Sequence, residues 1–393
     1  MLAQWRLFLH PKKQRLRHFV YVIAYDCVRI LRPIRPNSVI LATNRTHVLT
    51  DNLRAISDHL DLEKYHVRTF FLASPSESKT SRFLTRIRFV AAMATTEYTL
   101  VDDFLPTVYA IRLRPGARLI QVWHALGALK RVGFSRGGKN GGPVATSISH
   151  KNYTDVIVSS TPIRKDFAEA FGVSLDTVHA TGAPRSDLFF DEDAQRSARA
   201  TVYAAYPTLQ GKRVILFAPT FRGESKRTAY YPANFIDLDR IGAALGEDDI
   251  FVLKLHPFVK DHLHIPHAYR DKILDLGDYP EFNHLLLVSD VLITDYSSAI
   301  FDYSLLKRPV IFYAPDLDEY TRDRGFYYDF SEYAYGPLAR DLDSLIPLIR
   351  TETIDENRLS VFHEKFLGAC DGHATQRFLT TILADPQEVA NAT

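Results

Sequence analysis

Short apolar runs alternate with amphipathic stretches over most of the chain, and this alternation predicts an open α/β protein with parallel strands. In the first half of the chain, the runs that predict strands cover residues 38–42, 66–72, 98–101, 118–123 and 155–160. The stretches with helical spacing that separate them cover residues 52–59, 83–95 and 162–171. A polar, alanine-rich stretch at residues 191–207 then predicts a helix that links two domains.

A second α/β run follows residue 211 and predicts a second domain of the same kind. Its expected strands cover residues 214–218, 250–255, 291–294 and 310–313, with a shorter candidate at 273–276. Its expected helices cover residues 236–245, 279–288 and 300–306. From about residue 342 the sequence predicts further helices, which can cross back onto the first domain. We therefore divide the chain into residues 1–36, 37–200 and 201–393.

Residues 1–36 form a basic segment that differs from the rest of the chain. They contain a single acid, Asp26, and eight basic residues: Arg6, Lys12, Lys13, Arg15, Arg17, Arg29, Arg32 and Arg35. The apolar part of the segment is shorter than the roughly 20 residues that a bilayer-spanning helix needs. Such a segment can lie flat on an anionic membrane surface. It can equally be a helix that packs on the protein's own body and keeps its charges in solvent.

Composition supports a globular protein and narrows its partners. The chain has 393 residues, enough for two domains, with 46% apolar and 24% charged residues. Its formal net charge of +2 gives no basis for nucleic-acid binding. Its two cysteines, Cys27 and Cys370, do not make a disulfide framework or a zinc site, and we expect neither a metal nor a cofactor. The sequence shows no signal-peptide pattern.

The most informative stretch is a strand-turn-helix-strand unit at residues 290–314. Its first strand ends at Asp295-Tyr296-Ser297-Ser298, and an amphipathic helix follows directly, with Ser297 or Ser298 as the expected N-cap. A helix that starts at the carboxyl end of a parallel strand presents free backbone N–H groups and can bind a phosphate. The same four residues can also form an ordinary capped turn without a ligand, so other motifs must decide.

Polar side chains follow three more of the predicted strands. Thr220 and Arg222 follow the strand at 214–218, and His256 follows the strand at 250–255. Parallel strands bring these residues to the same sheet edge as the Asp295 turn. His124 follows the strand at 118–123 in the first domain, so we expect it to face His256 across a cleft. A lone histidine after a strand is usually structural, but this combination favours a shared active site.

Two loops have open interpretations. Residues 133–143 are rich in glycine and basic, so this loop either closes over an anionic substrate or is a plain flexible loop. The turn at residues 182–187 carries Arg185 and Asp187. It either contacts substrate or joins two elements through a salt bridge.

These residue types suit transfer from a nucleotide-activated donor. A histidine near its ordinary pKa can deprotonate an acceptor hydroxyl, while a positively charged histidine, an arginine and helix N–H groups stabilise a departing phosphate. The chain has no G-x-x-x-x-G-K-[ST] phosphate loop and no G-x-G-x-x-G fingerprint, which argues against ATP hydrolysis and hydride transfer. Nothing singles out the acidic pair Asp102-Asp103 as metal ligands.

The motifs resemble those of the CDP-glycerol glycerophosphotransferase family, the teichoic acid primases and polymerases. The resemblance covers most of the chain from about residue 121 to about residue 377, in the order of the family's motifs. The matching segments are QVWHALGALKRVGF, VSSTPIRKDFAEAFG, TGAPRSDLFF, VILFAPTFR, FVLKLHP, LITDYSSAIFDYSLLKRPVIFYAPDLDEYTRDRGFYYDF and CDGHATQR.

This resemblance implies a GT-B-like fold of two Rossmann-like domains, with residues 37–200 on the acceptor side and residues 201–393 binding the donor. It implies a peripheral enzyme at the cytoplasmic face of the membrane. The donor would be CDP-glycerol and the released product CMP. The acceptor would be an undecaprenyl-type lipid-linked saccharide or a growing polyol-phosphate polymer.

The resemblance also assigns roles to residues. The family's essential histidines fall on His124, the candidate base for the acceptor hydroxyl, and on His256, which would support the donor phosphates. Arg222, Ser297 and Ser298 would bind the same phosphates. Further candidate substrate-binding positions in the matching motifs are Thr220, Asp295, Arg324, Asp371 and Lys130.

One departure from the family pattern keeps alternatives open. Many members read W-H-G-T-P-L-K where this chain reads W-H-A-L-G-A-L-K, so the histidine and lysine stay but a small hydroxyl residue is absent. The donor can therefore be CDP-ribitol instead of CDP-glycerol, and the product a capsule-type polymer. Two other functions remain: a glycosyltransferase or epimerase that uses a UDP- or GDP-sugar, and a non-catalytic membrane-surface adaptor.

Overall fold

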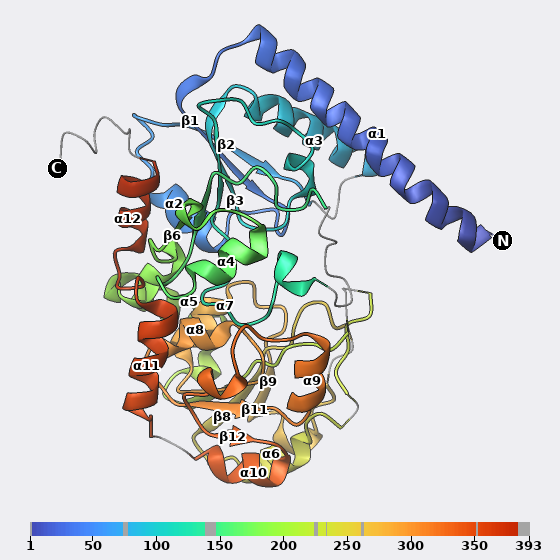
Figure 1. Cartoon of the computed structure of the whole chain (residues 1–393). Coiled ribbons are helices and arrows are strands. Elements are labelled where there is room, and N and C mark those ends of the chain that lie inside the picture. Colours follow the sequence, from blue (N-terminus) through green and yellow to red (C-terminus); the bar gives the residue numbers. More distant parts are fainter. Residues whose placement is uncertain are drawn as a thin grey trace.

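The protein consists of two parallel six-stranded sheets, each covered by helices and placed one above the other (Figure 1). This computed structural model describes residues 2–73, 78–137, 147–223, 227–232, 234–260, 263–350 and 353–383, and only the backbone of residues 2–14. The predicted α/β class with two parallel sheets is confirmed. The exact domain boundaries, after residues 36 and 200, stay predictions.

The first sheet has the strand order β2-β1-β3-β4-β5-β6. Its strands are β1 (Arg35–Thr43), β2 (His66–Phe71), β3 (Thr96–Val101), β4 (Arg118–Gln121), β5 (Asp155–Ile157) and β6 (Val178–His179). Alternate residues of β1 enter different cores: Val39 and Leu41 lie in one apolar cluster, Ile40 and Ala42 in another. Because helices cover both faces, the inner strands β3, β4 and β5 are buried on both sides, as parallel strands usually are, whereas the edge strand β2 is more exposed.

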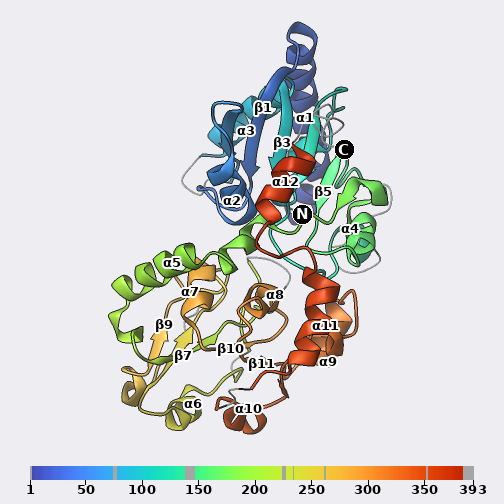
Figure 2. The ribbon, with the colours of Figure 1, turned by 90° about the vertical axis from the view of Figure 1, so that its left-hand side faces the viewer.

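Helices of both chain ends cover the first sheet. The core on the Val39 side also contains side chains of α2 (Asp51–His59) and of α12 (Ala374–Ile382). The other face packs against α3 (Lys79–Met93) and α4 (Arg164–Phe171). The tail therefore crosses back onto the first half, as predicted, while α11 (Glu356–Leu367) stays beside the second half (Figure 2).

The second sheet has the strand order β12-β11-β10-β7-β8-β9. Its strands are β7 (Arg213–Phe217), β8 (Asp249–Leu253), β9 (Ile273–Asp275), β10 (Val291–Thr294), β11 (Val310–Tyr313) and β12 (Leu338–Ala339). The helices around it are α6 (Leu238–Ala244), α7 (Phe282–Val288), α8 (Ala299–Ser304), α9 (Leu317–Asp323) and α10 (Leu342–Leu348). The predicted linker is α5 (Glu192–Ala205), which packs on α7.

The two halves share one apolar core. The cluster that contains Ile40 of β1 also contains Leu216 of β7 and Phe301 of α8. The halves therefore meet over packed side chains, and this contact fixes the loops that lie between the two sheets.

The N-terminal helix α1 (Leu2–Leu31) packs on α3 through one side and leaves another side open. Tyr21 and Tyr25 are buried, and the Tyr21 ring lies 5.8 Å from that of Phe83. This confirms packing on the protein's own body. Five large apolar side chains in the described part of α1 nevertheless remain exposed. Three of them lie within two turns at helical spacing, exposed by 63%, 61% and 45%, and we call them the α1 stripe: Leu16, Phe19 and Ile23. Among the described residues, no helix is long and apolar enough to cross a membrane.

Candidate active site between the two sheets

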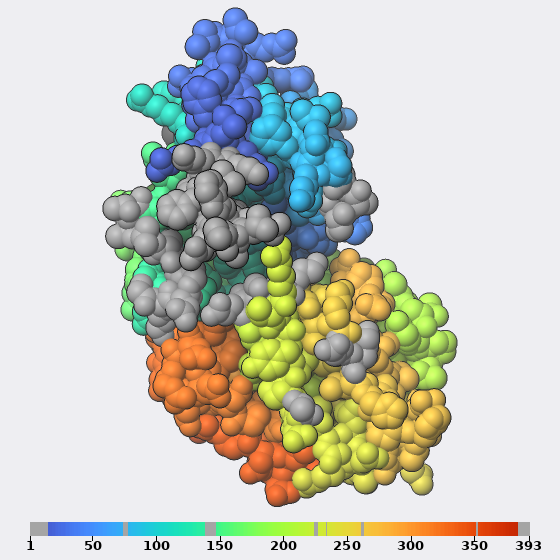
Figure 3. Space-filling view, turned by 90° about the vertical axis from the view of Figure 1, so that its right-hand side faces the viewer, coloured from blue at the N-terminus to red at the C-terminus, as the bar shows by residue number. Residues whose placement is uncertain are grey.

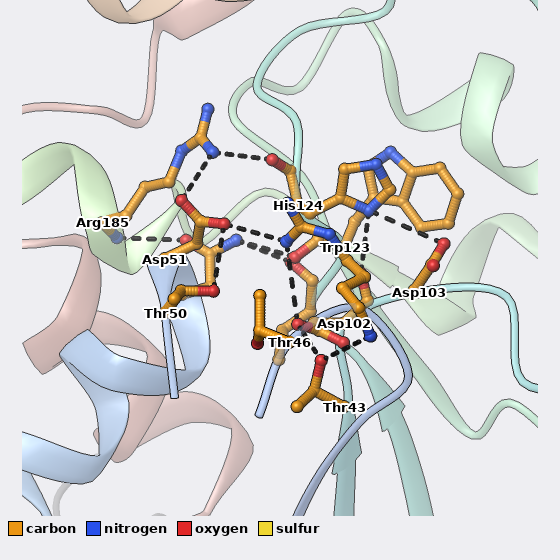
Figure 4. A network of polar contacts seen from close by, with 12 residues as sticks. Thr43, Thr46, Thr50, Asp51, Asp102, Asp103, Trp123, His124 and Arg185 are labelled. Carbon is orange, nitrogen blue, oxygen red and sulfur yellow. Dashed lines mark hydrogen bonds and ion pairs between the residues drawn. The ribbon is translucent and has the colours of Figure 1, made fainter. Parts of the chain in front are cut away.

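His124 lies just beyond the carboxyl end of β4 and is held in one tautomer (Figure 4). Its Nδ1 lies 2.9 Å from the Asp102 carbonyl oxygen and 3.8 Å from Asp103 Oδ1. A carbonyl oxygen can only accept, so Nδ1 carries the proton and Nε2 keeps its lone pair. Burial, with help from the nearby Arg45 cation, lowers the pKa of His124 to about 4. At neutral pH the ring is therefore uncharged and able to accept a proton.

His256 lies beyond the carboxyl end of β8 and has the opposite tautomer. The backbone N–H of Phe258 donates to His256 Nδ1 at 3.2 Å, so the neutral ring carries its proton on Nε2. Its ring centroid lies 4.5 Å from that of Phe221 and 4.6 Å from that of Phe258. Burial, and then the charges of Lys130 and Lys254, lower the pKa of His256 to about 4. The expectation of a positively charged histidine is therefore wrong for this ring in the free protein.

Lys130 lies on the loop that follows His124, and its charge helps to lower the pKa of His256. It therefore links the surroundings of the two histidines. It forms an isolated antiparallel bridge with Phe326, and its ammonium lies 5.5 Å from the centre of the Tyr320 ring. The loop continues along the second half, where Arg131 N donates to Gly325 O at 3.2 Å. The first half thus places a cation on the donor side of the predicted cleft.

Gly127 explains how this loop can approach the second half so closely. Its φ of +62° lies in the left-handed region, and a Cβ at this position would lie 2.3 Å from the ring of Phe301 on α8. Its N–H donates to Ser159 Oγ at 2.9 Å. The loop that carries His124 and the helix after the Asp295 turn therefore pack directly on each other.

The Asp295 turn follows β10 as predicted. The carboxylate of Asp295, however, bonds to nearby backbone groups and does not point into a ligand site. Asp295 is fully buried, and its Oδ1 accepts the N–H groups of Thr220 at 2.7 Å and Tyr296 at 2.6 Å. Ser298 occupies the N-cap position of α8 without a side-chain cap, whereas Ser297 Oγ accepts the N–H of Ala299 at 3.2 Å. Asp295 therefore shapes the turn, and the half-buried serines are its parts that can face a ligand.

Arg222 is surrounded by acceptors and aromatic rings. Two of its nitrogens donate to the Asp316 carboxylate, at 2.5 and 2.8 Å, and a third donates to Asp295 at 2.9 Å. Its side chain is 7% exposed, and both carboxylates help to hold its pKa above the ordinary arginine value. Arg222 forms an isolated antiparallel bridge with Tyr230. The yellow-green segment after β7 rises toward the upper half (Figure 3). In the free protein the Arg222 guanidinium therefore braces the donor side, and phosphate binding by it stays a prediction.

The remaining candidates lie in different surroundings. Arg324 ends α9, directly before the residues that contact the Lys130 loop, and it makes no ion pair within the described ranges. Asp371 lies between α11 and α12, and its carboxylate is bonded to Arg377 at 2.8 and 3.0 Å. The structure therefore brings the loop of His124 and Lys130 against the second half, where the charge of Lys130 acts on His256. That His124 faces His256 across a cleft stays a prediction, and Asp371 has a structural partner.

Sequence reasoning left the role of Arg185 undecided and did not identify the partners of its side chain. Arg185 forms ion pairs with Asp51 at 3.2 Å and Asp302 at 2.5 Å, which confirms the salt-bridge interpretation of its turn. Only the two charges of that turn signalled it, and nothing in the sequence named its partners. Most of the glycine-rich loop, residues 138–143, lies outside the described residues, so its predicted closure is untested.

The geometry can be compared with known proteins. The chain is 42% identical over 383 residues to the teichoic acid poly(ribitol-phosphate) polymerase of Bacillus spizizenii, covering 97% of this chain and 61% of that protein. It is 36% identical over 375 residues to the teichoic acid ribitol-phosphate polymerase TarK of Staphylococcus aureus, covering 94% of this chain and 73% of that protein. The chain thus spans less than two thirds of the length of the first of these relatives.

A solved structure of the wall teichoic acid polymerase TagF matches the fold with a TM-score of 0.77 at 22% identity, covering 99% of each chain. The likeness confirms the predicted GT-B-like fold. Residues 23–384 match the family model described as CDP-Glycerol:Poly(glycerophosphate) glycerophosphotransferase. The fold, the order of the motifs and this match agree, and the chain belongs to the CDP-glycerol:poly(glycerophosphate) glycerophosphotransferase family.

Proposed function

We propose that this protein transfers a polyol phosphate from a CDP-polyol to a hydroxyl of a lipid-linked saccharide or a growing polyol-phosphate chain, and releases CMP. The observation that carries the proposal is the pair of opposite tautomers. His124 presents a lone pair on Nε2 and His256 presents an N–H there. One ring is built to accept a proton and the other to donate a hydrogen bond, as phosphoryl transfer to a hydroxyl requires.

In the proposed reaction, His124 Nε2 takes the proton of the acceptor hydroxyl as its oxygen attacks the phosphorus that bears the polyol. The bond from that phosphorus to the CMP oxygen breaks, and CMP leaves with the bonding electrons. His256 Nε2–H, the Lys130 ammonium and the amides of the Ser297-Ser298 turn are the groups that would stabilise the charge on the phosphates. Both pKa shifts favour the neutral rings that these roles need.

The relatives bear on the choice of polyol. The motif resemblance led us to expect CDP-glycerol, and the family description also refers to glycerol phosphate. The relatives at 42% and 36% identity, however, are named for ribitol phosphate. We therefore infer CDP-ribitol as the preferred donor, with CDP-glycerol as the second candidate.

The α1 stripe supports a place at the cytoplasmic face of the membrane. Its three apolar side chains are exposed beside Arg15 and Arg17, which are also exposed. An apolar face with flanking cations suits shallow insertion into an anionic membrane surface. The lipid-linked acceptor would then reach the site from the surface on which α1 lies.

The decisive experiment offers the purified protein CDP-ribitol, CDP-glycerol and a UDP-sugar, each with a lipid-linked disaccharide acceptor. Mass spectrometry then identifies the nucleotide released and the product. CMP with an elongated acceptor is the expected result, with CDP-ribitol the faster donor. Release of UDP would favour a glycosyltransferase or epimerase instead. No turnover with any donor, with intact binding to vesicles, would favour a non-catalytic adaptor.

A further inference from the structure

The backbone at Trp123 is strained, and side chains from elsewhere hold both it and the carbonyl of His124. Trp123 has a φ of +49°, in the left-handed region that bulky residues avoid. Asn52 Nδ2 donates to Val122 O at 2.8 Å and to Trp123 O at 3.2 Å. Arg185 Nη1 donates to His124 O at 2.6 Å (Figure 4). Strain of this kind persists only where surrounding contacts enforce it, and it concentrates at functional sites.

Arg185 reaches three structural elements with one guanidinium. It lies in the 3₁₀ turn Pro184–Phe189, and its side chain is only 10% exposed. Besides the His124 carbonyl, it contacts the Asp51 carboxylate of α2 at 3.2 Å and the Asp302 carboxylate of α8 at 2.5 Å. Its own backbone N–H donates to Asn52 Oδ1 at 3.0 Å, so the two groups that hold the strained backbone also hold each other.

Asp302 connects this arrangement to the donor side. It belongs to α8, the helix that begins directly after Ser297 and Ser298. The chain of contacts therefore runs from the carbonyl of His124, through one guanidinium, to the helix that carries the phosphate turn. The packing of Gly127 on Phe301 joins the same loop and the same helix at a second point.

A purely stabilising role explains this ion pair poorly. Within the described part of the chain, Arg185 Nε and Asp302 Oδ1 are buried without a hydrogen-bond partner. Burial raises the pKa of Asp302 to about 6 although Arg185 opposes this shift. A buried pair that leaves polar atoms unpaired is a weak source of stability, and defined geometry is a better reason for keeping it.

We propose that Arg185 is a positioning residue, which fixes the His124 imidazole relative to the Ser297-Ser298 turn. The inference rests on the proposed function, in which these two groups act on acceptor and donor. A lysine would keep the charge of Arg185 but lose its fork, and one ammonium cannot reproduce the contacts to both the His124 carbonyl and Asp302.

The first test compares Arg185→Lys and Asp302→Asn with a matched control, Arg118→Lys. Arg118 also binds a carboxylate with two nitrogens, at 2.9 and 2.5 Å from Asp155, but it begins β4 whereas His124 lies beyond its end. We expect Arg185→Lys to lower kcat for CMP release at least tenfold and leave the donor KM within twofold. Asp302→Asn should act in the same direction. Arg118→Lys should lower only the melting temperature.

The second test does not depend on turnover. The chain has two tryptophans, so Trp5→Phe leaves Trp123 as the only tryptophan. In that background, with tryptophan excited selectively, Arg185→Lys should shift the fluorescence of Trp123, and Arg118→Lys should not. A variant Arg185→Lys with a lower melting temperature but unchanged kcat and emission would overturn the proposal. If the wild-type protein releases no CMP from any CDP-polyol, the proposed function fails, yet the emission still decides whether Arg185 holds the Trp123–His124 backbone.

Discussion

The opposite tautomers of the two histidines can be tested with amide side chains that copy one ring nitrogen at a time. The amide of glutamine can place an N–H near the Nε2 position of histidine, and that of asparagine near Nδ1. His256 needs an N–H at Nε2, because Phe258 already donates to its Nδ1. His124 needs a basic lone pair at Nε2, because its Nδ1–H donates to the Asp102 carbonyl. An amide can supply the first of these functions but not the second.

The expected magnitudes follow from these roles. General-base catalysis contributes roughly 10²–10⁴ in rate, so His124→Gln, His124→Asn and His124→Ala should each lose about 3–5 kcal/mol of transition-state stabilisation. Losing one preorganised donor costs roughly 10²–10³ in kcat, which we expect for His256→Ala and His256→Asn. His256→Gln should retain the donor and lose only about tenfold. Glutamine should thus rescue one histidine and not the other.

The assay follows CMP release from the CDP-polyol at a fixed concentration of lipid-linked acceptor, and separates kcat from the donor KM. Thermal unfolding of each variant controls for loss of structure. The reasoning is refuted if His256→Asn is more active than His256→Gln. It is also refuted if His124→Gln keeps activity comparable to that of His256→Gln.

Three further predictions follow from the site and from α1. Because burial keeps His124 neutral, kcat/KM should stay constant as pH falls from 7 and decline only near its pKa of about 4; a decline near 6.5 would contradict this. Gly127 and Gly211 both have positive φ, but only Gly127 faces a ring. Gly127→Ala should therefore lower the free energy of unfolding by more than the roughly 1–2 kcal/mol of backbone strain expected for the control Gly211→Ala. Equal losses in denaturant unfolding would refute this. Serine at all three positions of the α1 stripe should weaken binding to anionic vesicles without lowering the melting temperature, and unchanged sedimentation with vesicles would reject the membrane contact.

The fold could be predicted because its signals are local. Apolar runs of strand length and helical spacing placed β1, β7, β8 and β10 close to their positions in the structure. The rule that ligands gather at the carboxyl ends of parallel strands then located His124, His256 and the Asp295 turn. Each of these inferences needs only the order of residues within one strand and the loop after it.

The partners of charged side chains could not be predicted, because they come from distant parts of the chain. The sequence suggested that Arg222 is a free phosphate ligand. In the structure its guanidinium forms ion pairs with Asp295 and Asp316. Arg185 meets Asp302, which lies 117 positions later in the sequence. Whether a cation is free or neutralised depends on how the two halves pack, and periodicity within one element carries no information about that contact.

The return of α12 to the first half has a consequence for how the protein is made. Phe378 and Ile382 of α12 share a core with Leu53 and Ile56 of α2. During translation, α2 emerges hundreds of residues before α12, so the apolar face that α12 later covers stays open to water while the second half is still being synthesised. The first half can complete its interior only after α12 has left the ribosome, so until then this apolar face is open to misfolding and aggregation.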